Sequence, residues 1–262
     1  MSVWKSNGKY RRVGNYGRYS GTGAQEHKYW DFTFDAGGDG ADQSLPNSTS
    51  GTFKPLYVND AGANNESLCL IPAGSDQNSR IGQKVRLLTL DLRINVLLPA
   101  NTTVGGTAMH DGNVLHLALI MDHQANGTVP DYNEVFQNPT GTTGTDTTNC
   151  VDWFRRLDRT GRYTVLWNKS YLCNRAGGGG YSPTAGGYDV HMSEHNCRQM
   201  DKHFKLDTII EYQDSVNEPD GSYSMSKVCC NNLILFAFVR LNNATVGRRV
   251  ALQGNGRIRY VG

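Results

Sequence analysis

The clearest pattern in the chain is the alternation of apolar and polar residues in SRIGQKVRLLTLDLRINVLL, residues 79–98. A period of two is typical of a β-strand with one buried and one exposed side. The alternation changes phase at Leu87-Leu88, so we expect a β-bulge near Leu87. Beyond it, the even-numbered residues from Leu88 to Val96 are predicted to face the core. The odd-numbered residues are polar and are predicted to face the opposite side: Thr89, Asp91, Arg93 and Asn95.

Similar patterns predict further strands, separated by long loops. Pro55 restricts one of them to a sheet edge, and Gly254 and Gly256 are expected to interrupt the last one. The run at 229–241 is apolar and is expected to be one buried strand. Helical signals are limited to a single turn at 131–136 and to 152–158. The predicted strands cover 29–34, 52–58, 83–98, 114–122, 162–173, 202–214, 229–241 and 248–262.

This spacing of strands, with almost no helical periodicity, predicts an all-β protein: a single jelly-roll antiparallel β-sandwich with long surface loops. The domain is expected to cover 29–262, with loop insertions near 124–150 and 174–200, and 262 residues suffice for one sizeable core. No apolar run is long enough to span a bilayer and no secretory signal is present, so membrane insertion is not expected. The six cysteines are accordingly expected to be reduced.

Charge is distributed unevenly along the chain. Residues 1–28 hold six Lys or Arg against one Glu, a net charge of +5, so the other 234 residues carry −3. The first 28 residues are also rich in Gly, Tyr and Asn and cannot bury a core. We therefore expect them to form a flexible basic N-terminal arm.

The arm interleaves cations with tyrosines. Cations neutralise phosphates, and tyrosine rings stack on unpaired bases, so this composition favours single-stranded nucleic acid. Nothing in the arm is suited to reading base edges, so binding is expected to be tolerant of sequence. A solvated basic tail is the alternative. The candidate contacts are Lys5, Lys9, Tyr10, Arg11, Arg12, Tyr16, Arg18 and Tyr19.

Other candidate chemistry in the sequence is weak. The glycine run at 177–180 lacks the Lys-Ser/Thr of a phosphate loop, and HMSEHNC at 191–197 lacks the paired spacing of a zinc site. Neither G-x-S-x-G nor H-E-x-x-H occurs. We therefore expect no cofactor, no metal site and no enzymatic activity.

Several stretches resemble the coat proteins of small circular single-stranded DNA viruses, of the geminivirus-like and circovirus-like type. The resemblance begins with Arg80-Ile81-Gly82 and the basic alternating strand that follows. It continues through LALIMDHQANGTVPDYNEVF (117–136) and RTGRYTVLWNKSYLC (159–173). HFKLDTIIEYQD (203–214) and residues 231–262 resemble the final strands of that family in order. The resemblance covers 79–262 apart from the 174–200 insertion.

The resemblance implies a closed icosahedral shell of sixty copies of this chain, whose inward-facing arm contacts the single-stranded DNA genome. It also implies a host receptor, which the sequence does not identify, and assembly of the virion in the host nucleus. This arm is shorter and less Arg-dense than is usual in the family, and no cysteine precedes Cys69. Arg86 and Arg93 are predicted to supplement the arm from the sheet. A lectin-like β-sandwich binding module is the alternative.

Overall fold

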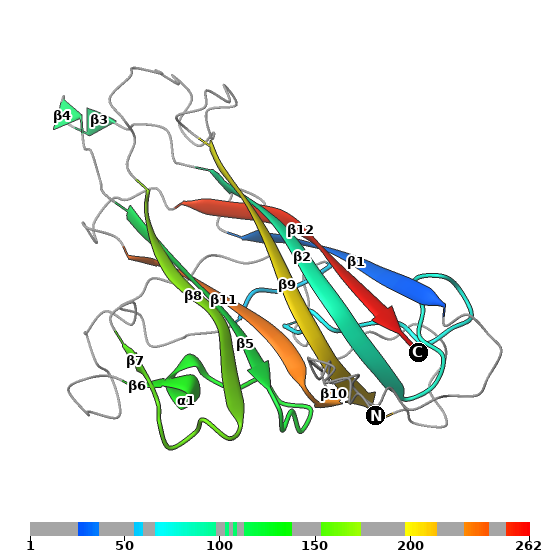
Figure 1. The fold of residues 1–262 in the computed structure, drawn as a ribbon. Coiled ribbons are helices and arrows are strands. Elements are labelled where there is room, and N and C mark those ends of the chain that lie inside the picture. The colour runs from blue at the N-terminus through cyan, green and yellow to red at the C-terminus, as the bar shows by residue number, and fades with distance from the viewer. Residues whose placement is uncertain are drawn as a thin grey trace, which may run out of the picture.

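The structure is a computed structural model, and its described residues form antiparallel sheets and one short helix (Figure 1). It describes residues 26–36, 55–59, 66–97, 103–104, 107–108, 113–137, 153–173, 197–213, 228–240 and 250–262. The main strands are β1 (His27–Ala36), β2 (Lys84–Leu97), β5 (Asn113–Asp122), β8 (Tyr163–Cys173), β9 (Cys197–Tyr212), β10 (Val228–Cys230), β11 (Asn232–Arg240) and β12 (Ala251–Val261). The short elements are β3 (Thr103–Val104), β4 (Thr107–Ala108), α1 (Tyr132–Val135), β6 (Phe136–Gln137) and β7 (Phe154–Arg155).

Two sheets make up the body of the fold. One has the order β1-β12-β2-β9-β10 and the other β11-β5-β8. Residues 55–59 and 66–70 lie beside β11, because the Leu56 N–H donates to the Leu235 carbonyl at 2.8 Å and the Leu68 N–H to the Leu233 carbonyl at 2.9 Å. The chain thus passes repeatedly between two antiparallel layers, as in a jelly roll. The predicted fold class is confirmed. Within the described residues, no helix is long and apolar enough to cross a bilayer.

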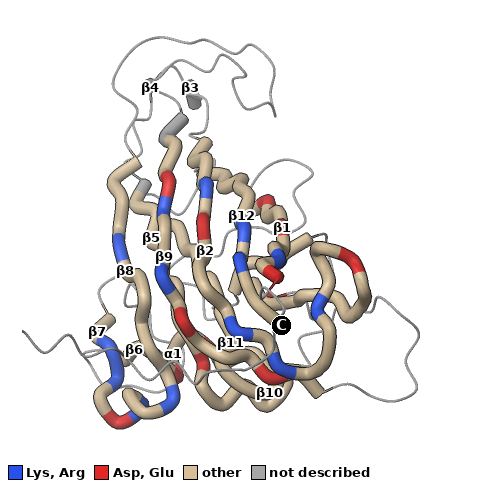
Figure 2. Tube along the Cα trace, turned by 45° about the vertical axis from the view of Figure 1, so that its right-hand side comes forward, with Lys and Arg blue, Asp and Glu red and all other residues tan. Residues whose placement is uncertain are grey.

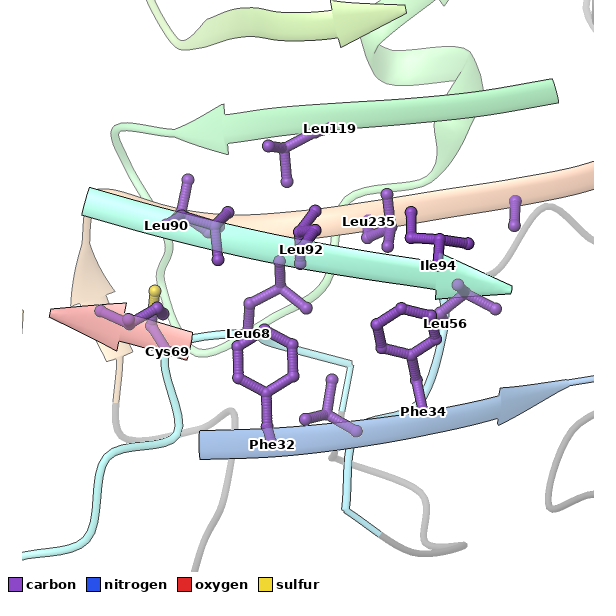
Figure 3. Packing of buried hydrophobic residues seen from close by; sticks show 14 of the residues in the cluster. Phe32, Phe34, Leu56, Leu68, Cys69, Leu90, Leu92, Ile94, Leu119 and Leu235 are labelled. Atoms are coloured by element: carbon purple, nitrogen blue, oxygen red, sulfur yellow. The ribbon is translucent and has the colours of Figure 1, made fainter. Parts of the chain in front are cut away.

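The core lies between the two sheets. Figure 3 shows side chains of β1 and β2 packed with Leu119 and Leu235 of the other sheet and with Leu56 and Leu68, which lie beside β11. These side chains are buried because each strand turns every second residue inward. The apolar alternation of the sequence therefore becomes the dry interior of the sandwich.

The bulge predicted near Leu87 of β2 is confirmed, since the register shifts between Leu87 and Thr89. Leu87 pairs with Tyr260 and is fully buried, whereas Leu88 is skipped in the register and is partly exposed. The expectation that Leu88 faces the core was wrong, because it is the extra residue of the bulge. From Leu90 onward the even-numbered residues are buried, as predicted.

The terminal strand is continuous, so the expected interruption at the glycines was also wrong. Gly254 pairs with Phe34 and Gly256 with Phe32 across β1 and β12. A Cβ on Gly254 would lie 2.6 Å from Phe34 Cε2, and one on Gly256 would lie within 2.7 Å of three ring atoms of Phe32. The glycines leave room for these rings, which cover them on the core side of the sheet.

The three-stranded sheet is buried on both faces along β11 and β5, whereas β8 is partly exposed. Its outer face carries a second cluster, in which the Tyr132 ring of α1 stacks on Phe136 at 4.4 Å and meets Phe238 of β11 edge-on at 4.8 Å. This double burial explains the continuous apolar run of β11. The one-turn helix predicted at 131–136 is confirmed as α1, but 153–160 is not helical and contains β7 and turns.

The run predicted as one strand at 229–241 is two strands in different sheets. Asn231 separates β10 from β11 and has a positive φ of 58°. Its side chain holds the corner, since Nδ2 donates to the Ile209 carbonyl at 2.6 Å and Oδ1 lies 2.6 Å from His123 Nδ1. Residues 55–58 are not a regular strand. β1 begins at His27 and β9 at Cys197, earlier than predicted.

Candidate nucleic-acid interface

The predicted contact residues fall into two groups. The eight of the arm, from Lys5 to Tyr19, lie outside the described residues, so their role stays a prediction. Arg86 and Arg93 lie on β2 and are exposed on the face of the five-stranded sheet opposite the core. The candidate interface that the structure describes is therefore this exposed face of β1, β12, β2 and β9.

The register of the strands aligns polar side chains in rows across this face. One row runs from Asp31 through Arg257 and Asp91 to His203. Arg257 donates from Nε and Nη2 to both oxygens of Asp31, each at 2.6 Å, and this pairing raises the pKa of the guanidinium. His203 Nδ1 lies 2.6 Å from Asp91 Oδ1. The row therefore alternates cation-forming and anionic groups.

The two arginines predicted from the sequence both have carboxylates beside them. Arg86 Nε donates to Asp207 Oδ1 at 2.7 Å, and Arg93 Nε lies 3.8 Å from Asp201 Oδ1. Blue and red positions occur together along β2 and β9 in Figure 2. Exposed pairs of this kind contribute little to stability, about 0–1 kcal/mol each, but they offset the charge available to a phosphate.

Two other cations of this face were missed by the sequence analysis. Arg259 of β12 and Lys205 of β9 are exposed, and neither makes an ion pair with a described residue. Arg259, unlike Lys205, lies at a depression of about 800 Å³ that is also lined by Asp31 and Arg93. The alternation in GRIRYV shows that Arg259 is solvent-facing, but only the strand register reveals that no carboxylate lies opposite it.

Lys28 was counted with the arm, but it belongs to β1 and is buried. Its Nζ donates to the carbonyls of Asp76 and Ser79, each at 3.1 Å. Arg80 is buried nearby, where Nε donates to the Ile71 carbonyl at 3.2 Å and the guanidinium lies over the Tyr212 ring. These two cations hold the 71–82 segment in place.

Two other buried side chains, His116 and Cys69, have structural roles. His116 lies between Ser170 Oγ and Tyr132 Oη, each 2.9 Å from a ring nitrogen. Cys69 is fully buried, and this burial raises the pKa of its thiol to about 12, so it is a poor nucleophile. Among the described residues no group of three or more His, Cys, Asp or Glu is arranged to hold a metal ion.

No protein-family model matches this chain, and no curated protein matches it either. Its function is therefore inferred from the residues and their geometry.

Proposed function

We propose that this chain is the coat subunit of a small virus with a circular single-stranded DNA genome. In this function, copies of the chain assemble into a closed icosahedral shell. The observation that carries the proposal is the jelly-roll arrangement of the two sheets, β1-β12-β2-β9-β10 and β11-β5-β8. Double-sheet jelly rolls are the common building block of viral capsids, although lectins also use them.

The position of the basic arm favours the coat subunit over a lectin-like module. Because β1 begins at His27 and Lys28 is buried within it, the cationic stretch that precedes β1 in the sequence is residues 1–26, with a net charge of +4 from five basic residues and Glu26. It leads into β1, which is at the edge of the five-stranded sheet. It supplies phosphate contacts without sequence-specific readout, which is what packaging a whole genome requires.

Electron microscopy of the purified recombinant chain tests the proposal. Uniform closed particles are expected. Monomers or dimers at micromolar concentration and physiological salt would instead favour the lectin-like module. Assembly inside the host nucleus and attachment to a host receptor are part of the same proposal, and they are to be examined once particles are in hand.

The cargo is tested with variants of the arm. Deletion of residues 2–25 leaves β1 and Lys28 intact, and it is expected to lower the ratio of absorbance at 260 nm to that at 280 nm in the purified particles. The matched control replaces Arg11, Arg12 and Arg18 by Gln and keeps the length of the arm. An unchanged absorbance ratio in both variants would exclude the arm from packaging.

A further inference from the structure

One row on the exposed face of the five-stranded sheet differs from its neighbours. It consists of Tyr29, Arg259, Thr89 and Lys205, which the strand register places side by side on β1, β12, β2 and β9. We call it the Arg259 row. Its two cations have no carboxylate partner among the described residues, whereas the other arginines of the face are paired with aspartates.

The two cations of the Arg259 row flank a hydroxyl group. Neighbouring strands lie about 4.8 Å apart, so the backbones at Arg259 and Lys205 are separated by about 10 Å, with Thr89 between them. Thr89 Oγ1 is covered from solvent and has no hydrogen-bond partner. A covered hydroxyl without a partner is costly. When the flexible side chains of Arg259 and Lys205 turn toward a bound phosphate, they uncover Thr89 Oγ1, and a phosphate oxygen then accepts its hydrogen bond.

An aromatic ring lies at the end of the row. The guanidinium carbon of Arg257 is 4.7 Å from the centre of the Tyr29 ring and covers one side of it. Cations next to an aromatic side chain are the combination with which proteins bind single-stranded nucleic acid, because phosphates and base faces are then contacted together. An isolated phosphate ion has no aromatic group to stack on the Tyr29 ring, whereas a nucleotide has a base.

We propose that the Arg259 row binds the sugar–phosphate backbone of single-stranded nucleic acid. Arg259 and Lys205 contact phosphates, Thr89 donates to a phosphate oxygen, and Tyr29 lies against a base. The proposal rests on the coat-protein function and specifies which part of the sheet meets the genome. It assigns the main sheet contacts to Arg259 and Lys205 instead of Arg86 and Arg93, whose charges are already offset by Asp207 and Asp201.

The test is the salt dependence of binding, measured with the full-length chain. Fluorescein-labelled oligo(dT) and oligo(rU) are titrated by anisotropy over a salt series. Light scattering at each salt concentration shows whether the chain is present as subunits or as assembled shells. Each phosphate contact on a single strand contributes about 0.7 to the slope of log K against log salt. Arg259→Gln with Lys205→Gln is therefore expected to reduce the slope by about 1.4 for both oligonucleotides.

Two control variants isolate the effect. Arg93→Gln with Asp201→Asn removes a pair from the same face without changing the net charge. Lys169→Gln with Arg159→Gln removes two charges from β8 and the turn before it. Both controls are expected to keep the wild-type slope. Arg259→Lys is expected to keep it as well, because the positive charge remains. If the double variant of the row fails to fold, the single variant Arg259→Gln carries the test, with an expected fall in slope of about 0.7.

The outcomes separate this proposal from the coat-protein function. If wild-type shells form but the Arg259 and Lys205 variant keeps the wild-type slope, the row is refuted and the coat function stands. An equal fall in slope for the Lys169 and Arg159 control also overturns the proposal, because the effect would then not depend on the Arg259 row. The proposal is also overturned if the Arg259 and Lys205 variant keeps the wild-type slope but no longer forms shells. The row would then be a contact surface between copies of the chain. If the wild-type chain forms no shells, the coat-protein function is refuted, whatever the slope of the variants.

Discussion

Gly256 has no space for a side chain, and replacing it by alanine is the most direct test of how the sandwich is packed. The added Cβ would lie within 2.7 Å of three atoms of the Phe32 ring, whereas carbon atoms in contact are normally about 3.5–4.0 Å apart. The ring or the strand must therefore move by about 1 Å or more. Neither moves easily, because Phe32 is buried and β12 is hydrogen-bonded between β1 and β2.

The expected magnitude follows from two opposing terms. Overpacking a well-filled core costs about 1–3 kcal/mol, and this site belongs near the upper end. Replacing glycine by alanine also restricts the unfolded chain, which returns about 0.4–1 kcal/mol. Gly256→Ala is therefore expected to lower the free energy of unfolding by about 2 kcal/mol.

Urea unfolding of dissociated subunits, followed by tryptophan fluorescence, measures this change. Gly161→Ala is the control, because no atom lies within 4 Å of the added Cβ, and it is expected to shift stability by about 0.5 kcal/mol at most. Phe32→Leu makes room for the methyl group, so combining it with Gly256→Ala is expected to cost less than the sum of the two single changes. If Gly256→Ala matches the Gly161 control, or if the double variant is additive, the packing argument is refuted.

Three other positions are testable in the same unfolding assay. Asp122 is buried and accepts two hydrogen bonds from Arg162, at 3.0 and 3.1 Å, so Asp122→Asn is expected to cost about 3 kcal/mol; an unchanged midpoint contradicts this. Asn231 has a φ of 58°, so Asn231→Val is expected to cost about 1–2 kcal/mol more than Asn231→Gly, and equal costs would disprove the backbone explanation. Burial raises the pKa of Cys69 from 9.0 to about 12, so unfolding becomes easier as pH rises through this range, because only the unfolded thiol releases its proton. Cys69→Ala is expected to flatten that part of the pH profile, and identical profiles would show that Cys69 contributes nothing.

The sequence alone determined the fold class, because burial with a period of two is a local property of each strand. The run at 79–98 predicted the longest part of the exposed face correctly, including Asp91 and Arg93. The one-turn helix followed from the local pattern at 131–136. The charge of the arm is likewise readable from residue types, since it depends on no partner.

The tertiary structure decided everything that depends on pairing between distant segments. Gly254 and Gly256 were predicted to interrupt the last strand, but β12 is continuous and phenylalanine rings of β1 cover both glycines. From the sequence, Arg86 was predicted to be available to a phosphate, but β9 places Asp207 beside it. Arg259 was not predicted as a contact, and only the register shows that no carboxylate lies opposite it. The physical reason is that a cross-strand partner is set by the register of strands far apart in the chain. That register is chosen by the packing of the whole core, and no local pattern contains it.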